Sequence, residues 1–304
     1  GQNVSGVGVI TALVNDFVAT GAATSHTNPQ AQIDTNFGAS VVASTFQQHF
    51  LLLHLLLPHV ALYSLPATVE WPTRHPQPTA RAALQLLVRR HAILRTSYEM
   101  TQADALQTIL PTDGFVVPLD ECSEVEWSKS MKHMLHTPFA LTKAPPIRAL
   151  LMYSDLRQRT RLLVVADHVA IDYASIILVQ RELGLICDQL HQRMTPALPP
   201  MPLQYADFAL WRRDQRCDEE ATTLEWWRAK LTGAPQLLDL PLDRLRVSMQ
   251  DVFGSSMQVH IEPELGRSMR FLCAHERVST LSCLLAAWSA LLMHLSGQDE
   301  IVLG

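Results

Sequence analysis

The chain has 304 residues, of which 48% are hydrophobic and 17% are charged, with a formal net charge of -5 and a pI near 6.2. These values predict a globular protein of one large or two ordinary domains. Basic clusters with interleaved aromatic residues are absent from the sequence, which argues against nucleic acid as a partner.

The cysteines predict free thiols rather than disulfide bridges. They are five in number, widely scattered and never arranged as C-x-x-C: Cys122, Cys187, Cys217, Cys273 and Cys283. Most lie in apolar helical patterns, which is typical of small core residues in a reducing compartment. The chain opens with Gly1, and its first lysine or arginine is Arg74, so we expect no signal peptide. We therefore expect a cytoplasmic location and a piece of a longer protein.

The first third of the chain predicts a linker followed by alternating helices and strands. Residues 1–40 are rich in Gly, Ala, Ser, Thr and Asn, which is typical of an approach segment. Residues 44–65 are dense in leucine but interrupted by histidines and Pro58, so we expect a buried helix and no membrane span. A strand is expected at 65–71. A helix capped by Thr79 should then end in the basic stretch Arg89–Arg95, where cations suit the helix dipole. Short strands at 97–99, 105–110 and 115–118 and a helix at 123–135 should follow.

The most informative stretch begins with two strands at 147–154 and 160–166, which predict an antiparallel hairpin. Residues 162–166 are all apolar, so the second strand should be buried on both faces. It ends at Asp167-His168, with Asp172 four residues after the histidine. Apolar residues then recur at helical spacing, which predicts a helix from Tyr173 to about Arg193. His168 should therefore lie in a strand-to-helix turn. Taken alone, this pattern is better explained by structure, with Asp172 as a helix N-cap, Asp167 as the end of a strand and His168 satisfied by a carbonyl.

The remaining sequence predicts a crossing segment and a second domain. Residues 194–202 contain four prolines and no glycine, which indicates a stiff connection. Helices are expected at 224–231, 264–275 and 280–295, and strands at 256–261 and from 300 onward. We therefore divide the chain into a linker (1–40), an N-terminal lobe (41–195) and a crossing segment with a partial C-terminal lobe (196–304). The sequence has no G-x-S-x-G, Walker, dinucleotide or H-E-x-x-H motif, so we expect no metal centre and no tightly bound cofactor.

Four separated stretches resemble the motifs of the condensation domains of nonribosomal peptide synthetases. Ser44–Gln47 resembles S-x-x-Q, although His49 and Leu51 stand where the family usually has Arg and Trp. Residues 90–96 (R-H-A-I-L-R-T) match R-H-x-x-L-R-T, and 205–211 (Y-A-D-F-A-L-W) are similar to Y-x-D-[YF]-A-x-W. Residues 167–173 (D-H-V-A-I-D-Y) resemble the active-site motif H-H-x-x-x-D-G. The resemblance covers about 41–304, and a whole condensation domain would be longer.

The resemblance implies an α/β fold of two layers (α+β), with one chloramphenicol-acetyltransferase-like lobe and the start of a second, similar lobe. A tunnel would run between the lobes. Peptidyl or acyl carrier proteins would deliver the donor and the acceptor on phosphopantetheine arms, and adenylation or ketosynthase modules would be neighbours. The product would be a secondary metabolite, made without nucleic acid or membrane as a partner.

The resemblance also implies roles for individual residues. His168 would position and deprotonate an amine that attacks a thioester. Asp172 would orient the turn through a salt bridge to an arginine, and Asp167, in place of the first motif histidine, would be structural. Tyr173 and Ser175 would lie along the substrate tunnel. Because Tyr173 replaces a glycine, its phenol would narrow the tunnel or force a different backbone angle.

Three alternatives stay open. The chain could be an inactive condensation-like docking domain in which Tyr173 blocks the tunnel. It could be a heterocyclisation domain, since Asp167, Asp172 and Ser175 spell D-x-x-x-x-D-x-x-S. A stand-alone acyltransferase that uses coenzyme A or a free alcohol is the third alternative.

Overall fold

The computed structural model describes residues 40–61, 63–73, 75–102, 104–142, 145–154, 156, 158–214, 219–244, 257 and 259–303. It divides into two compact units, Gly1–Arg216 and Cys217–Gly304. The predicted linker, except for Ser40, and the thiol of Cys217 lie outside the described residues. The division falls after the boundary expected at residue 195, because α6 (Tyr205–Asp214) packs against β1 (Ser40–Val42) and the 3-10 turn η1 (Ala92–Arg95) of the first unit.

The main sheet of the first unit has four strands in the order β2-β7-β6-β5. Their bounds are Ser64–Trp71 for β2, Leu119–Ser123 for β5, Ile147–Ser154 for β6 and Arg159–Asp167 for β7. β7 runs antiparallel to both β2 and β6, and β5 runs parallel to β6. The hairpin predicted from 147–154 and 160–166 is therefore confirmed, and β7 is a central strand.

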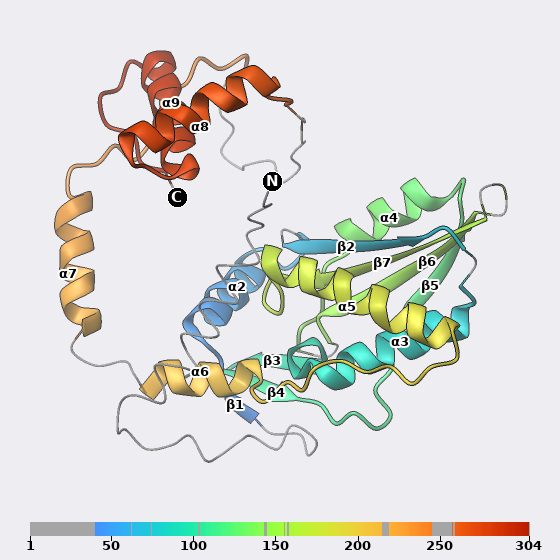
Figure 1. The fold of residues 1–304 in the computed structure, drawn as a ribbon. Coiled ribbons are helices and arrows are strands. Elements are labelled where there is room, and N and C mark those ends of the chain that lie inside the picture. The colour runs from blue at the N-terminus through green and yellow to red at the C-terminus, as the bar shows by residue number, and fades with distance from the viewer. Residues whose placement is uncertain are drawn as a thin grey trace. The chain divides into compact units, whose positions relative to one another are not determined.

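Helices cover both faces of this sheet (Figure 1). α3 (Gln77–Arg90) and α5 (Tyr173–His191) pack against each other on one face, and α4 (Trp127–His136) lies on the other. Alternate residues of β7 pack into two separate clusters of buried apolar side chains. Leu162 and Val164 join the larger cluster, whereas Leu163 and Val165 pack with Met134 of α4. The prediction that this strand is buried on both faces is confirmed.

Several predicted boundaries in the first unit are wrong, each for a local reason. α2 (Thr45–Leu56) ends at its cap Leu57, just before Pro58, so the helix does not extend to residue 65. α3 begins after Pro76 rather than at Thr79, with a proline in its first turn. Residues 115–118 form no strand, and pairing with β6 begins only at Leu119. Since β5 extends to Ser123, α4 starts later than expected.

A second, smaller sheet has the order β1-β4-β3, with β3 at Thr96–Met100 and β4 at Ala105–Ile109. Both of its strand pairs are antiparallel. β3 follows η1 directly, so this sheet is joined to the end of α3 by the residues that resemble R-H-x-x-L-R-T.

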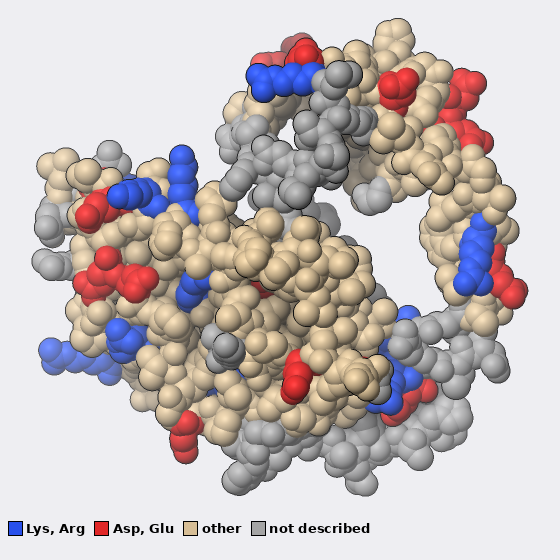
Figure 2. All heavy atoms as spheres, turned by 180° about the vertical axis from the view of Figure 1, so that it is seen from behind, with Lys and Arg blue, Asp and Glu red and all other residues tan. Residues whose placement is uncertain are grey.

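Charged side chains of both signs are interspersed over the face of the first unit that Figure 2 displays. On β2 and β7, Glu70 pairs with Arg159 at 2.9 Å and with Arg161 at 2.8 Å. These side chains are about one third to one half exposed, so water screens the pairs and their contribution to stability is small.

The second unit consists of helices in its described part: α7 (Glu219–Leu231), α8 (Pro263–Glu276) and α9 (Thr280–Ser296). Its buried apolar side chains among the described residues are Cys273 and Leu292, whereas Trp288 of α9 is 53% exposed. Residues 257, 259–261 and 300–303, which fall in the strands predicted at 256–261 and from 300, form no strand, because a strand needs a neighbour to bond and the described residues of this unit include none. Among the described helices no single one is long and apolar enough to cross a bilayer; α8 and α9 pass that test only together, across a bend of 105°.

Candidate functional site

The turn between β7 and α5 holds the residues predicted to be functional. Asp172 is the N-cap of α5, and its Oδ1 accepts hydrogen bonds from the backbone N (2.8 Å) and Oγ (2.7 Å) of Ser175. These bonds satisfy helix donors that would otherwise lack partners. Asp172 forms no ion pair with an arginine among the described residues, so its predicted salt bridge stays a prediction. This cap orients the end of the turn where α5 begins.

Asp167 closes the other end of the turn. Its side chain is 1% exposed, and Oδ1 accepts a hydrogen bond from the backbone N of Val169 at 3.0 Å. Oδ2 lies 2.9 Å from Nε2 of His54 on α2. That contact has the distance of an ion pair but lacks the alignment of a hydrogen bond, since Nε2 of His54 has no hydrogen-bond partner among the described residues. Asp167 therefore holds the loop in place and is buried away from solvent.

His168 sits in a box of aromatic rings. The ring of Phe50 is stacked on the imidazole, with centroids 4.6 Å apart and planes inclined by 17°. Phe46 and Tyr63 present their edges at 5.7 Å and 6.2 Å, and the backbone N of His168 donates to the carbonyl of Tyr63 at 2.9 Å. Nδ1 of His168 is buried and has no hydrogen-bond partner in the described part of the protein. Among the described residues no carbonyl therefore satisfies this nitrogen.

One face of α2 supplies most of these contacts, and the sequence reasoning missed it. Phe46, Phe50 and His54 are spaced by four residues, so they lie along one stripe of the helix. Their partners are the adjacent residues Asp167 and His168. The signal that could have revealed this stripe is the F-x-x-x-F-x-x-x-H spacing that begins inside the S-x-x-Q motif, at Phe46.

Tyr173, which stands at the motif glycine, is 78% exposed within the structure. It is the first residue of α5 and is not among the residues with positive φ, so no left-handed backbone is needed at this position. The expectation that the phenol narrows the tunnel or forces a different backbone angle stays a prediction. Its ring is also not among those that contact His168 in the described part of the chain.

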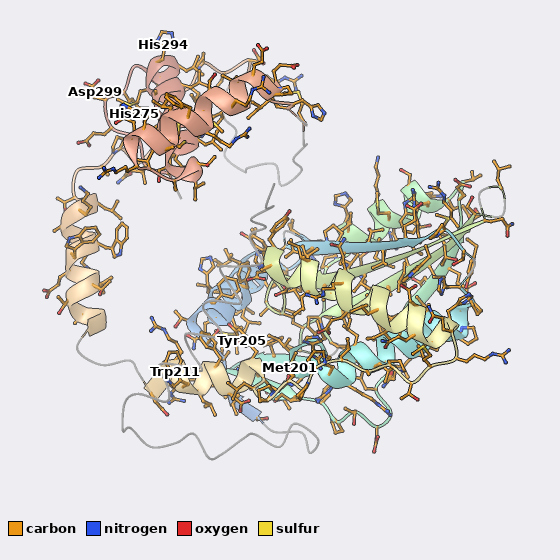
Figure 3. The ribbon with its side chains drawn as sticks, in the orientation of Figure 1. Met201, Tyr205, Trp211, His275, His294 and Asp299 are labelled. Atoms are coloured by element: carbon orange, nitrogen blue, oxygen red, sulfur yellow. The ribbon has the colours of Figure 1, made fainter. Side chains whose placement is uncertain are left out.

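The S-x-x-Q motif is a capping box that also reaches into the core. The backbone N of Gln47 donates to Oγ of Ser44 (3.2 Å), and the backbone N of Ser44 donates to Oε1 of Gln47 (2.9 Å). Nε2 of the fully buried Gln47 donates to Tyr98 and to Gln107. Oγ of Ser44 lies 2.9 Å from the hydroxyl of Tyr205 on α6 (Figure 3), which ties the first motif to the last.

The R-H-x-x-L-R-T motif joins three segments. Nε of Arg90 lies 3.0 Å from Oε1 of Glu182 on α5, and Nε2 of His91 lies 2.6 Å from Oε2 of the same carboxylate. Nη1 of Arg90 donates to the carbonyl of Pro199 in the crossing segment at 2.5 Å. Arg95 is 1% exposed and donates to the carbonyls of Val88 and Leu110. The motif therefore has a structural role, since it links the end of α3 to α5 and to the crossing segment.

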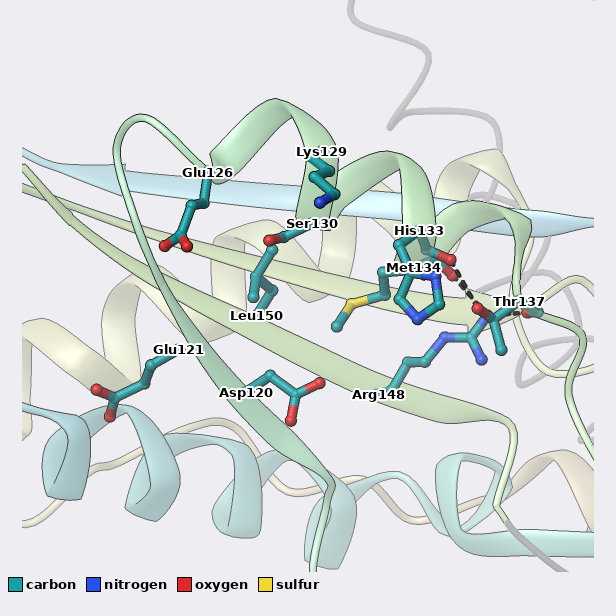
Figure 4. A pocket seen from close by; sticks show the side chains of 10 residues that line it. All are labelled: Asp120, Glu121, Glu126, Lys129, Ser130, His133, Met134, Thr137, Arg148 and Leu150. Atoms are coloured by element: carbon teal, nitrogen blue, oxygen red, sulfur yellow. Dashed lines mark hydrogen bonds between the residues drawn. The ribbon is translucent and has the colours of Figure 1, made fainter.

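A cavity of about 490 Å³ lies between α4, β5 and β6 and contains none of the predicted site residues (Figure 4). Arg148 extends along it beneath α4, donates to the carbonyls of Met134 and Thr137, and lies 3.9 Å from the centroid of the Phe139 ring. Burial lowers the pKa of Arg148 to about 10, and the charge of Asp167 opposes this shift. No group of three or more His, Cys, Asp or Glu that could hold a metal ion occurs among the described residues.

Comparison with known sequences identifies relatives along most of the chain. The family model for the condensation domain matches residues 39–304. Tyrocidine synthase 2 from Brevibacillus parabrevis is 30% identical over 288 residues, which cover 94% of this chain and 8% of that protein. Phosphinothricin tripeptide synthetase PhsB from Streptomyces viridochromogenes is 33% identical over 228 residues, which cover 72% of this chain and 19% of that protein. The chain thus spans a small part of the length of these relatives.

Solved structures show the same fold at low sequence identity. The first condensation domain of the calcium-dependent antibiotic synthetase, in complex with a substrate analogue, aligns with a TM-score of 0.72 at 15% identity over 86% of this chain and 63% of that chain. The X-domain from teicoplanin biosynthesis, in its complex with OxyB, aligns with a TM-score of 0.63 at 22% identity over 74% of this chain and 50% of that chain. The predicted chloramphenicol-acetyltransferase-like α/β fold is confirmed. By its motifs, its fold and the match over residues 39–304, the chain belongs to the condensation-domain family.

Proposed function

We propose that this chain catalyses amide-bond formation between an acyl or peptidyl thioester on one carrier protein and an amine on another. The observation that carries the proposal is the placement of His168 directly after strand β7, with its imidazole stacked on the ring of Phe50. The membership of the family and the peptide synthetases among the relatives support this reaction.

In the proposed reaction the amine nitrogen attacks the thioester carbon and forms the C–N bond. The C–S bond then breaks, and the sulfur leaves as the thiol of the donor arm. One proton must move from nitrogen to sulfur, and an imidazole within hydrogen-bond reach can carry it. An α-amine with a pKa near 8 is already partly neutral at cellular pH, so making the nucleophile costs only about 1 kcal/mol.

The surroundings of His168 favour a positioning role. Its Nδ1 is enclosed by protein, so Nε2 is the nitrogen left for a substrate. When Nε2 accepts a hydrogen bond, the ring proton resides on Nδ1, which has no hydrogen-bond partner in the described part of the protein. Orientation of two reactants can contribute roughly 7 to 11 kcal/mol, whereas a general base typically contributes about 10²- to 10⁴-fold in rate. We infer that His168 mainly holds the amine in line with the thioester.

The partners under this proposal are peptidyl or acyl carrier proteins with phosphopantetheine-bound substrates, together with the adenylation or ketosynthase modules that load them. A four-domain nonribosomal peptide synthetase, whose structure aligns with this chain at a TM-score of 0.72, 17% identity and 86% coverage of this chain, supports such a multidomain setting. The proposal includes the cytoplasmic location that the cysteine content predicts.

The test is transfer of a radiolabelled acyl group from a donor carrier to an aminoacyl acceptor carrier. We expect His168→Ala to lower the transfer rate by at least about 10²-fold with the fold intact by circular dichroism. His59→Ala is the matched control, since this histidine lies on the surface. Full activity of His168→Ala would refute the proposal. Absence of transfer by the wild-type chain would favour the docking role, and a thiazoline or oxazoline product would favour heterocyclisation.

A further inference from the structure

The imidazole of His168 lacks the hydrogen bond that usually fixes a functional histidine. In most sites one ring nitrogen donates to a carboxylate or carbonyl, and this bond sets the orientation of the other nitrogen. Here Nδ1 is buried without a hydrogen-bond partner among the described residues, and Asp167, the adjacent carboxylate, is turned to Val169 and His54. Another contact must therefore set the plane of the ring.

The flat face of Phe50 is that contact. Its ring lies 4.6 Å from the imidazole and is inclined by 17°, so rotation of either ring about its terminal bond would break the stack. Phe50 is 7% exposed and is itself held by the edges of Phe46 at 4.8 Å and Tyr63 at 4.9 Å. The stacked pair is thus clamped by two further rings.

The same helix also holds the backbone of the turn. One helical turn after Phe50, His54 contacts the carboxylate of Asp167, the residue directly before His168. α2 therefore meets the turn at two consecutive residues, once at a carboxylate and once at the imidazole. Because Phe50 and His54 share one face of a rigid helix, the two contacts position the imidazole as one unit.

We infer that Phe50 is a positioning residue for the reaction: stacking on its ring sets the plane of His168, in place of the hydrogen bond that Nδ1 lacks. This inference rests on the proposed function of His168. Phe50 touches the imidazole and not the reacting atoms, so its loss leaves the chemistry possible but misaligned. Misplacement of a reacting group by about 1 Å can cost about 10²-fold in rate.

The experiment compares Phe50→Leu with Phe50→Tyr and with the matched control Phe139→Leu in the 304-residue chain. Leucine keeps apolar bulk at position 50 but removes the flat face, whereas tyrosine keeps it. Phe139 packs on the core and over Arg148, so Phe139→Leu makes the same chemical change at a site without a ring contact to His168. For each variant we would measure single-turnover transfer at several acceptor concentrations, thermal unfolding, and the proton NMR signals of the His168 ring in histidine-labelled protein.

We expect Phe50→Leu to lower the maximal transfer rate by between about 10- and 10²-fold with little change in the acceptor concentration at half-maximal rate. The His168 ring protons should move downfield, because the shielding by the stacked ring is lost. Phe50→Tyr and Phe139→Leu should keep both the rate and the His168 signals near wild type.

A wild-type rate for a folded Phe50→Leu variant, alongside an inactive His168→Ala variant, would overturn the role of Phe50 and leave the proposed function standing. Should Phe50→Leu fail to fold, a loss of rate in Phe50→Tyr with unchanged His168 signals would overturn it as well. Full activity of His168→Ala would remove the proposed function and, with it, this inference.

Discussion

Oε2 of Glu182 lies 2.6 Å from Nε2 of His91, and the same carboxylate also pairs with Arg90. The glutamate belongs to α5 and its partners to the end of α3, so the contact joins the two helices that cover one face of the main sheet. The side chains of all three residues are between 7% and 18% exposed. Through this cluster the motif residues at the end of α3 bind α5, the helix that follows the turn holding His168.

Replacing Glu182 by alanine should destabilise the first unit strongly. Removal of one partner leaves Arg90 and His91 nearly buried without a compensating charge, which typically costs about 3 to 5 kcal/mol. Glu70→Ala is the matched control, because Glu70 also pairs with two cations but is 34% exposed, so we expect a loss of less than about 1 kcal/mol. Urea denaturation gives the free energy of unfolding of both variants. Equal losses would contradict the claim that the buried cluster of Glu182 stabilises the protein more than the exposed pairs of Glu70.

The same cluster predicts an acid-dependent loss of stability. Burial raises the pKa of Glu182, but the hydrogen bonds and charges of His91 and Arg90 outweigh it, and the net pKa lies below the usual value. A lowered pKa means that the contribution to stability is complete above the unfolded pKa of about 4.3 and is lost as the pH falls through the folded pKa. The free energy of unfolding of the wild type should therefore fall more steeply below about pH 4 than that of Glu182→Gln. Parallel curves from pH 7 to pH 3 would show that the carboxylate is not the titrating group.

Asp167 and His54 should be energetically coupled. Asp167→Ala removes the acceptor of the Val169 backbone N and the contact of His54, so we expect a loss of about 2 kcal/mol. The same change in a His54→Ala background should cost less, with a coupling energy of about 0.5 to 1 kcal/mol. The double-mutant cycle is measured by chemical denaturation. Strict additivity of the two changes would mean that the 2.9 Å contact contributes nothing to stability.

Tyr173→Gly should have little effect on the folded state. The phenol is 78% exposed, so its removal loses little burial, and glycine in the first helical turn costs at most about 1 kcal/mol. We also expect the transfer rate to change by less than about threefold, because Tyr173 does not share the ring contacts of His168. A rate increase of tenfold or more would instead show that the phenol obstructs a substrate arm and would revive the blocked-tunnel alternative.

Cys187 should be inert in the native protein. Burial, reinforced by the charge of Asp188, raises the pKa of its thiol to about 12. The reactive thiolate is therefore scarce at pH 8, and the side chain is inaccessible as well. Iodoacetamide labelling followed by peptide mass mapping should modify Cys187 only after denaturation. Rapid labelling of the native chain would contradict the packing of α5 against α3 and the sheet.

Features that depend on local chain geometry could be predicted from the sequence. An uninterrupted apolar run specifies a strand buried on both faces, and β7 has that burial. Apolar spacing after Asp172 specifies α5, and the side chain of Asp172 caps it as its type suggests. The order of the four motifs identified the family before any tertiary contact was known. In the second unit the same reasoning failed for the described residues 257 and 259–261, because a strand forms only where another strand can accept its hydrogen bonds.

By itself, the sequence determined the strand, the helix and the turn that holds His168, because periodicity and capping are set by neighbours in the chain. Only the tertiary structure decided that Phe50 stacks on that imidazole, that His54 meets Asp167 and that Glu182 joins the basic end of α3. These contacts depend on which face of a remote helix is turned inward, and that orientation is set by the packing of the whole sheet and its helices.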